Sequence, residues 1–253
     1  MTVIATNGGV AAQRQVLPRW RPVDDFGDLI GVVRAHTQEQ LDSAFRLRFQ
    51  VYCVERGFED AARYPDGREH DHDDSRSMHC LLMHRPTDLA VGTVRLILPH
   101  SDAALPVSRV VGSQWHDLDL PAETTAEISR FAIAKTLRRH FDRGDAVRVA
   151  CGEAQRNLPM LTLGLIQAVV MMGRSRGITH VVAMMAPALH HLLARFGVEF
   201  QPIGEPVDHH GLRQPGWAAV SDLPDTLRHL VGADLLQLAA ESVGRASRQL
   251  AAA

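Results

Sequence analysis

Hydrophobic positions along the chain change their period several times, and each period predicts an element. Apolar or alternating runs predict strands at 29–35, 78–84, 90–98, 127–134, 179–185 and 198–203. Helical spacing predicts helices at 37–56, 158–176 and 187–195. Thr37, followed by Gln40, fits a capping box that opens the first helix, and Gly57 and Gly177 are expected to end the first two helices. Residues 99–122 have no regular pattern and are expected to be irregular.

The order of these elements predicts one mixed α/β domain of the α+β type. The pattern β-α-β-β-β-α-β-α-β begins with antiparallel hairpins and ends with alternating strands and helices. We assign residues 27–221 to this domain and residues 1–26, which lack clear periodicity, to an N-terminal arm. Residues 222–253 are expected to form a C-terminal helical extension with an alanine-rich end.

Composition is typical of a soluble globular enzyme, with 45% hydrophobic and 22% charged residues. A net charge of −2 and an aromatic content of 5% do not support nucleic-acid binding. The cysteines are few and far apart, which favours a cytoplasmic protein over a disulfide-bonded one. The N-terminus lacks a signal-peptide pattern, and the longest uncharged stretch, residues 157–173, is short for a transmembrane segment.

The first predicted helix carries a charge on its apolar face. Leu41, Phe45 and Tyr52 lie on one helical face by their spacing. Arg48 falls on the same face, so a guanidinium that is always charged is expected to point toward the core. A buried arginine is tolerated only when it is paired, ideally with a carboxylate.

Two predicted strands carry similar interruptions. Strict alternation in strand 90–98 puts Arg95 on one face with three uncharged residues, Val91, Thr93 and Ile97. Glu127 and Arg130 interrupt the apolar strand 127–134. The loop before these strands supplies four carboxylates, at Glu69, Asp71, Asp73 and Asp74. We therefore expect the three arginines to meet these carboxylates in one polar cluster. Exposed residues at element edges, or separate structural salt bridges, are the alternative.

The same loop, residues 69–74 (EHDHDD), also suggests a metal site with His70, His72 and the nearby His79. An H-x-H pair in a loop, without a further fixed ligand, is a weak signal for a metal. We therefore predict no metal site.

Four short motifs follow one another in the order and spacing of a known family. They are R-x-x-x-Y-x-x-x-x-x-F (Arg48, Tyr52, Phe58), D-x-x-D (Asp71, Asp74), G-T-V-R-L (Arg95) and E-x-x-R (Glu127, Arg130). This combination resembles the acyl-homoserine lactone synthases. The longer strings VYCVERGFE, YPDGREHD, GTVRLILP, EISRFAI and PIGEPVDHHGLRQP are similar to the acyltransferases associated with PEP-CTERM/exosortase systems, relatives of the N-acyl amino acid synthases. The likeness covers residues 40–220.

The resemblance implies the GNAT fold, a mixed twisted sheet flanked by helices, in which a V-shaped gap receives an acyl thioester. It also implies that six residues form a polar network beside this gap: Arg48, Asp71, Asp74, Arg95, Glu127 and Arg130. Tyr52 and Phe58 would wall the acceptor pocket. The partners of Arg48 would be the loop carboxylates and Glu127. A spacing of three puts Glu127 and Arg130 on opposite faces of a regular strand, so the resemblance further implies a β-bulge between them.

Amide formation from a thioester needs a base that removes a proton from the amine and donors that hold the developing oxyanion. Glu127 is the first candidate base and Asp74 the second. Backbone N–H groups from Phe131 to Ile133 are candidate oxyanion donors. One arginine of the cluster, Arg48, Arg95 or Arg130, is expected to bind an acceptor carboxylate through its planar fork.

These features predict an N-acyltransferase that moves a fatty acyl group from an acyl thioester to a small amine, with an amino acid as the favoured acceptor. No tightly bound cofactor is expected, and the donor is either acyl-ACP or acyl-CoA. The connector AKTLRRHFDRGDA lacks the glycine-rich loop of CoA-dependent GNAT enzymes. Its basic residues suit an acidic acyl carrier protein or a phosphopantetheine phosphate, with a solvated basic turn as the alternative: Lys135, Arg138, Arg139 and Arg143.

Two other functions remain open. The chain is an acyl-homoserine lactone synthase if its acceptor is S-adenosylmethionine, although those enzymes usually carry tryptophan where this chain has Phe58. It is a non-catalytic binder of acyl chains or carrier protein if turnover has been lost. The presence of both Glu127 and Arg130 argues against the second alternative.

Overall fold

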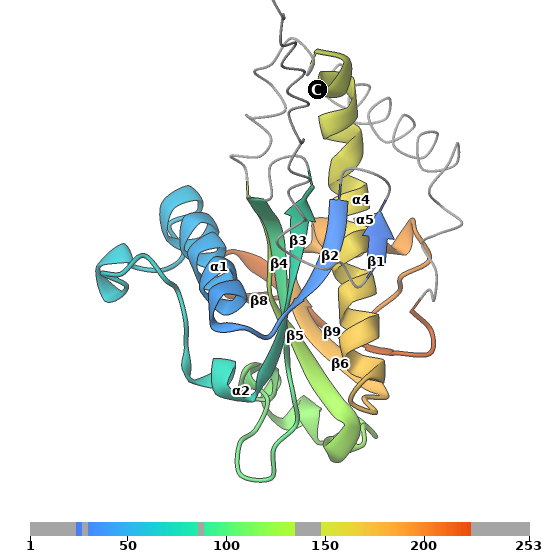
Figure 1. The fold of residues 1–253 in the computed structure, drawn as a ribbon. Helices are drawn as coiled ribbons and strands as arrows, with labels where there is room; N and C mark the ends of the chain where they lie inside the picture. The colour runs from blue at the N-terminus through green and yellow to red at the C-terminus, as the bar shows by residue number, and fades with distance from the viewer. Residues whose placement is uncertain (1–23, 27–29, 86–88, 135–147, 224–253) are drawn as a thin grey trace, which may run out of the picture.

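A twisted sheet organises the chain (Figure 1). The computed structural model describes residues 24–26, 30–85, 89–134 and 148–223. Within these residues the strand order is β1-β2-β3-β4-β5-β6-β9-β7, and β8 pairs with β9 beside this path. The strands are β1 Asp24–Phe26, β2 Ile30–Ala35, β3 Ser77–His84, β4 Leu89–Ile97, β5 Thr125–Ile133, β6 His180–Met185, β7 Gln201–Pro202, β8 Val207–Asp208 and β9 Leu212–Ala219.

Helices cover both faces of the sheet, with α1 on one side and α4 on the other (Figure 1). The α-helices are α1 Gln38–Phe49, α2 Pro106–Val111, α4 Arg148–Arg174 and α5 Pro187–Ala194. A π-helix, Gln50–Glu55, continues α1, and short 3-10 turns lie at Ala61–Arg63, His72–Arg76, Gly112–Trp115 and Ala122–Thr124. Together with the sheet, this arrangement confirms the predicted mixed fold.

The first helix begins as the sequence predicts. The Thr37 hydroxyl accepts the Gln40 N–H at 3.3 Å, and the Gln40 side chain accepts the Thr37 N–H at 3.0 Å. The helix then widens into the π-helix at Gln50 and is followed by Gly57, whose φ of 63° suits glycine. The π-helix carries Tyr52, one of the predicted site residues.

Strands β5 and β6 form a parallel pair that separates partway along its length. Residues 125–128 of β5 pair with residues 180–183 of β6. Beyond this point β5 continues against β4 and β6 continues against β9. The sheet therefore opens between β5 and β6 just after Ile128, in agreement with the V-shaped gap that the resemblance implies.

A β-bulge interrupts β5 at the start of this opening. Thr93 of β4 pairs with Ala132, whereas Arg95 pairs with Ser129, so Val94 alone faces both Arg130 and Phe131. Arg130 takes a positive φ of 50°, a conformation that non-glycine residues rarely adopt. Glu127, Ile128 and Ser129 pair regularly with β4, so the bulge consists of Arg130 and Phe131 and begins at Arg130 itself. The bulge that the resemblance implies is therefore present, but it lies at Arg130 and not between Glu127 and Arg130.

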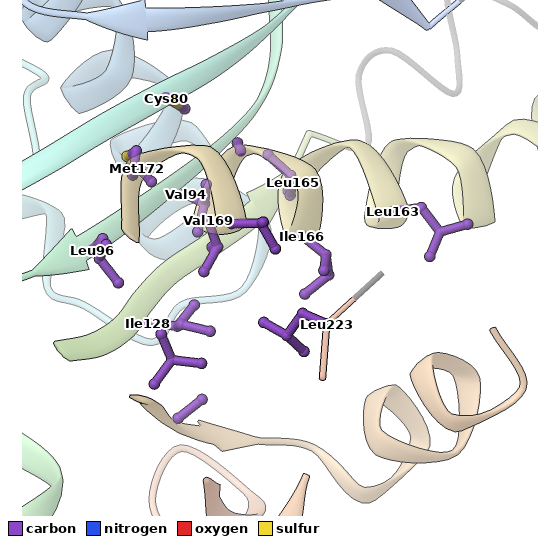
Figure 2. Packing of buried hydrophobic residues seen from close by; sticks show 14 of the residues in the cluster. Cys80, Val94, Leu96, Ile128, Leu163, Leu165, Ile166, Val169, Met172 and Leu223 are labelled. Carbon is purple, nitrogen blue, oxygen red and sulfur yellow. The ribbon is translucent and has the colours of Figure 1, made fainter. Parts of the chain in front are cut away.

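Two apolar layers pack on the sheet. The larger lies under α4, where Val169 and Ile166 pack with Val94, Leu96 and Ile128 of the sheet (Figure 2). The layer under α1 is smaller and includes Val33, Ala35, Ala44, Leu81 and Met83. Because charged side chains interrupt the α1 face, its core is split into patches around them.

Several predicted boundaries were wrong. Residues 99–122 include α2, which begins at Pro106, a favourable first helical residue. Helix α4 starts at Arg148 instead of 158, since polar residues before the apolar run also take part in it. Val91 does not share a face with Arg95, because the β3–β4 register shifts between Leu82 and Met83 and sends Val91 to the α4 layer.

The C-terminal part of the sheet also differs from the prediction. The expected strand 198–203 is reduced to Gln201–Pro202. Strands β8 and β9 were missed because β9 contains Pro215 and Gly216, which are disfavoured in strands. Burial of Pro215 and Gly216 and pairing with β6 stabilise β9 nevertheless, and the Pro215 carbonyl accepts the Ile203 N–H.

We predict that Thr37→Ala lowers the free energy of unfolding by about 1 kcal/mol, because an N–H of the first turn of α1 loses its acceptor. The measurement is urea denaturation followed by circular dichroism. Ser43→Ala is the matched control: its hydroxyl donates to the Glu39 carbonyl within the same helix, where alanine is the better helix former. An equal loss of stability in both variants would contradict the capping argument.

Candidate functional site

Three arginines meet three carboxylates on the α1 face of the sheet. Arg48 comes from α1 and its side chain is 0% exposed. Its Nε donates to Glu69 at 2.6 Å, and its Nη1 and Nη2 donate to Asp74 at 2.6 and 3.2 Å. The fork geometry is the bidentate arrangement that stabilises a buried guanidinium.

Arg95 and Arg130 complete this network. Arg95, on β4, donates from Nη1 to Asp71 and Asp74 and from Nε to the Ser129 hydroxyl. Arg130, on the β5 bulge, donates from Nη2 to Glu69 and Asp71, each at 3.0 Å. We call these six residues the arginine–carboxylate network: Arg48, Glu69, Asp71, Asp74, Arg95 and Arg130.

The loop that supplies the carboxylates is held in place by its own hydrogen bonds. Asp71 caps the 3-10 turn His72–Arg76: its carboxylate accepts the Asp73 N–H, and Asp74 accepts the Asp71 N–H at 2.7 Å. The Glu69 N–H donates to the Phe45 carbonyl of α1 at 3.1 Å. These bonds fix the carboxylates before any substrate binds.

The network keeps its carboxylates ionised. Burial alone would raise the pKa of Asp74, but hydrogen bonds and charges from Arg48 and Arg95 outweigh burial and hold this pKa well below its usual range. Burial of Glu69 is outweighed in the same way by Arg48 and Arg130, so its pKa is also lowered. Carboxylates with such low pKa values are weak bases.

Glu127 lies on the same face but outside the network. Its carboxylate accepts the Val107 N–H of α2 at 2.8 Å, and the residue is 4% exposed. Burial raises the pKa of Glu127 to about 7, although the Val107 N–H and the Arg95 charge oppose this. The expected pairing of Glu127 with Arg48 is therefore wrong: among the described residues, Glu69 and Asp74 take that place.

Tyr52 and Phe58 lie side by side next to the bulge. The Tyr52 hydroxyl donates to the Phe131 carbonyl at 3.3 Å, and the Arg130 guanidinium lies 5.5 Å from the Tyr52 ring centroid. The centroids of Tyr52 and Phe58 are 6.4 Å apart. Phe58 in turn stacks on His210 of the loop between β8 and β9, with centroids 5.4 Å apart.

Phe131 and Ile133 lie on β5 beyond its last pair with β6. Both side chains are half-buried and pack against the layer under α4. Their backbone therefore runs along the opening of the sheet, where the sequence analysis placed the oxyanion donors.

The sequence analysis named Glu69 as a loop carboxylate but did not choose it as a site residue. In the structure Glu69 is fully buried and joins Arg48 to Arg130, which the motif spacing alone did not indicate. The contact of the β8–β9 loop with Phe58 was also missed. Its sequence signals were the turn-forming string DHHG, residues 208–211, and the longer resemblance string PIGEPVDHHGLRQP that contains it, and neither indicated a contact with Phe58.

His79 is a further buried group beside the network. Its Nε2 lies 3.6 Å from Asp74, and its ring nitrogens have no hydrogen-bond partner among the described residues. Burial lowers the pKa of His79 to about 4, and the charges of Arg48 and Arg95 act in the same direction. The imidazole is thus neutral at physiological pH.

The three histidines of the candidate metal site do not converge. His70 packs against the Phe45 ring on one side of the loop, whereas His72 is exposed. In the part of the chain that the structure describes, no group of three or more His, Cys, Asp or Glu side chains is placed to hold a metal ion. The basic connector residues predicted to meet a donor, Lys135, Arg138, Arg139 and Arg143, lie outside the described residues.

Among the described helices, none has both the length and the hydropathy needed to cross a bilayer. This includes the predicted apolar stretch 157–173, which lies within α4. From Leu161 onward that stretch is buried, and it packs against the sheet (Figure 2).

Sequence comparison matches residues 47–141 to an acetyltransferase (GNAT) domain. The matched segment spans β3, β4 and β5 and includes every member of the arginine–carboxylate network. No curated protein matches the sequence of this chain.

Solved structures with the same fold include acyl-homoserine lactone synthases and an N-acyl amino acid synthase. BjaI, described as a CoA-dependent acyl-homoserine lactone synthase, aligns with a TM-score of 0.56 and 21% identity over 83% of this chain and 98% of its own. FeeM, an N-acyl amino acid synthase from uncultured soil microbes, aligns with a TM-score of 0.51 and 15% identity over 79% and 96%. The acyl-homoserine lactone synthase LasI aligns with a TM-score of 0.51 and 16% identity over 76% and 88%. The described chain therefore has the mixed, mostly antiparallel fold of the GNAT acyltransferases, and residues 47–141 carry its acetyltransferase (GNAT) domain match.

Proposed function

We propose that this protein is an N-acyltransferase that moves a fatty acyl group from a thioester, on acyl carrier protein or CoA, to the amine of an amino acid. The observation that carries the proposal is the position of Glu127, one residue before β5 and β6 separate. A buried carboxyl with a pKa of about 7 thus lies beside the opening in which the GNAT fold receives a thioester. A group with this pKa can take up a proton at neutral pH and release it again.

The proposed reaction begins with an amino acid ammonium near Glu127. Glu127 accepts one proton, directly or through water, and the free amine attacks the thioester carbonyl. The oxyanion that forms is held by backbone N–H groups of β5 in the stretch 131–133. When the intermediate collapses, the C–S bond breaks and the thiolate takes the second amine proton. The products are an amide and a free thiol, and Glu127 returns its proton to solvent.

The arginine–carboxylate network has a positioning role in this proposal. Asp74 is a weak base because Arg48 and Arg95 lower its pKa, so we retain Glu127 as the base. Arg130 is held by Glu69 and Asp71 at the bulge, and it thereby fixes the course of β5 along the opening. Tyr52 and Phe58 are proposed to contact the acceptor, since the Tyr52 hydroxyl donates to the Phe131 carbonyl and Phe58 lies beside the Tyr52 ring.

We predict that cells expressing the protein accumulate N-acyl amino acids and that Glu127→Gln reduces this product by at least a hundredfold, as expected for loss of a general base. Mass spectrometry of lipid extracts measures the product and identifies its amine and chain length. Glu123→Gln, at an exposed carboxyl just before β5, is the matched control and should keep the wild-type yield. Acyl-homoserine lactones in the extract would instead assign S-adenosylmethionine as acceptor. If the protein is folded but no acylated amine forms, either in cells or when thioesters and amines are added to it, the result would favour a non-catalytic binder of acyl chains or carrier protein.

Glu127→Gln is expected to fold. The pKa of Glu127 is higher in the folded chain than its ordinary value of 4.5, so ionisation weakens the folded state as the pH rises above that value. At pH 8 the neutral amide removes this cost and can still accept the Val107 N–H. Urea denaturation at pH 8 should therefore find the variant as stable as the wild type or more stable.

We predict that kcat at saturating acceptor rises with pH through about 7, because Glu127 must be ionised to accept the proton. The rate should fall about tenfold for each pH unit below this inflection. The measurement is the initial rate of thiol release between pH 5 and 8.5. The residual activity of Glu127→Gln should lack the inflection. If the variant keeps an inflection at the same pH, the inflection belongs to another group.

We predict that Glu69→Gln destabilises the protein by about 3–5 kcal/mol, because the buried Arg48 and the partly buried Arg130 lose their shared negative charge. Asp66→Asn, in the same loop, breaks only a surface pair with Arg68 and should have little effect on stability. Chemical denaturation of both variants measures the difference. A small effect of Glu69→Gln, similar to that of the control, would show that the network does not depend on this carboxylate.

A further inference from the structure

The arginines of the network have no free carboxylate-binding fork. Arg48 is occupied by Glu69 and Asp74, as described above. Arg95 donates to Asp71, Asp74 and Ser129, and Arg130 donates to Glu69 and Asp71. Nη2 of Arg95 and Nη1 of Arg130 make no hydrogen bond among the described residues, but a bidentate carboxylate needs two free donors on one edge of the guanidinium. It would therefore have to displace Ser129 or a carboxylate of the network. An amino acid acceptor therefore needs a different cation.

Arg213, the second residue of β9, is such a cation. Its side chain is half-buried, and it donates to two backbone carbonyls: Nη1 to Leu212 at 3.0 Å and Nη2 to His210 at 2.7 Å. Among the described residues, no acidic side chain forms an ion pair with it. Since a guanidinium carries five N–H donors, three remain for a ligand.

The guanidinium is positioned by an aromatic ring and by a strained turn. It lies 5.7 Å from the Phe58 ring centroid, and Phe58 also stacks on His210. The His210 carbonyl that binds Arg213 belongs to a residue with φ of 54°, which is rare for a residue other than glycine. Backbone strain of this kind persists where surrounding contacts maintain it, and it is found preferentially at functional sites.

These contacts connect the hairpin to the opening of the sheet. From Arg213 they lead to Phe58, then to the Tyr52 ring 6.4 Å further on, and then to the Phe131 carbonyl of β5. Strand β9 itself pairs with β6, on the other side of the opening. The hairpin side chains and the β5 bulge therefore border the same opening from its two sides.

Positive groups gather around Phe58 at the hairpin, and the hairpin's own carboxylate, Asp208, accepts the Gly211 N–H. Burial lowers the pKa of His209, and the positive charges of His210, Arg213 and Arg130 lower it further, while Glu59 opposes them. Glu59 is itself paired with Arg63 at 3.2 Å. Arg56 adds a second guanidinium 5.9 Å from the Phe58 ring.

We propose that Arg213, supported by Phe58, binds the carboxylate of the acceptor. This inference rests on the proposed function and names its acceptor class as a carboxylated amine. A planar guanidinium that lies on an aromatic ring keeps its edge free for a bidentate carboxylate. The site thus selects amino acids over amines of the same size that lack the charge.

The kinetic test measures kcat/KM for an amino acid acceptor and for the carboxamide of the same amino acid. The donors are dodecanoyl-CoA and dodecanoyl carrier protein. The wild type should prefer the acid by at least tenfold in kcat/KM. Arg213→Gln should reduce the acid-to-amide ratio toward one, mainly through the KM of the acid, and Arg213→Lys should restore part of the ratio. The control, Arg176→Gln, removes an exposed arginine after α4 and should keep the wild-type ratio.

A binding measurement separates failure of this inference from failure of the proposed function. N-dodecanoylglycine and N-dodecanoylglycinamide are titrated into wild type and Arg213→Gln by calorimetry. Tighter binding of the acid to the wild type, lost in the variant, supports the carboxylate site even if no acyl transfer is found. Acyl transfer with an acid-to-amide ratio that is the same in both proteins overturns the inference and leaves the proposed function standing. A change confined to the KM of the thioester also overturns it, since Arg213 then serves a phosphate of the donor.

Discussion

The arginine–carboxylate network is the interaction on which the rest of the structure depends. Arg48 and Arg95 are 0% and 2% exposed, so each guanidinium has lost its water and needs carboxylates at hydrogen-bond distance. Glu69, Asp71 and Asp74 each contact two arginines, and no one pair could supply that many bonds. The network therefore joins α1, the 69–74 loop, β4 and β5 into one unit, and β5 is one of the two strands that border the opening of the sheet.

This unit also sets two opposite environments for carboxyl groups on one sheet face. Inside the network, positive charge outweighs the effect of burial and lowers the pKa of Asp74. Glu127 is buried more deeply than Asp74, and one backbone N–H and a more distant arginine charge do not compensate for burial, so its pKa rises to about 7. Pairs of acidic groups whose surroundings separate their pKa values in this way mark candidates for structural and acid–base roles. The structure thus supports a positioning role for Asp74 and the proposed base role for Glu127.

Much of this arrangement could be predicted where local chemistry decides. Thr37 and Gln40 specify their capping box by themselves, and a guanidinium on an apolar stripe requires carboxylates nearby. The spacing of Glu127 and Arg130 raised the question of a bulge, and the family resemblance supplied the expectation of one, which the structure has at Arg130 and Phe131. The rest depends on tertiary contacts: β9 forms despite Pro215 because β6 provides a partner, and Val91 changes face because of a register shift. The choice of Glu69 over Glu127 as partner of Arg48 likewise depends on the path of the loop. The spacing of hydrophobic residues does not predict this path.

A satisfied network and a binding site make opposite demands on the same side chains. Arginines held by carboxylates stabilise the fold but present no free pair of donors to a ligand carboxylate, since a substrate would have to displace an existing partner. Groups left incompletely satisfied next to the opening can exchange partners with a substrate at lower cost. Among the described residues, Glu127, with one hydrogen bond, and Arg213, with donors to spare, meet this condition. This contrast supports the proposal that the motif arginines build the site, whereas recognition and proton transfer fall to residues at its border.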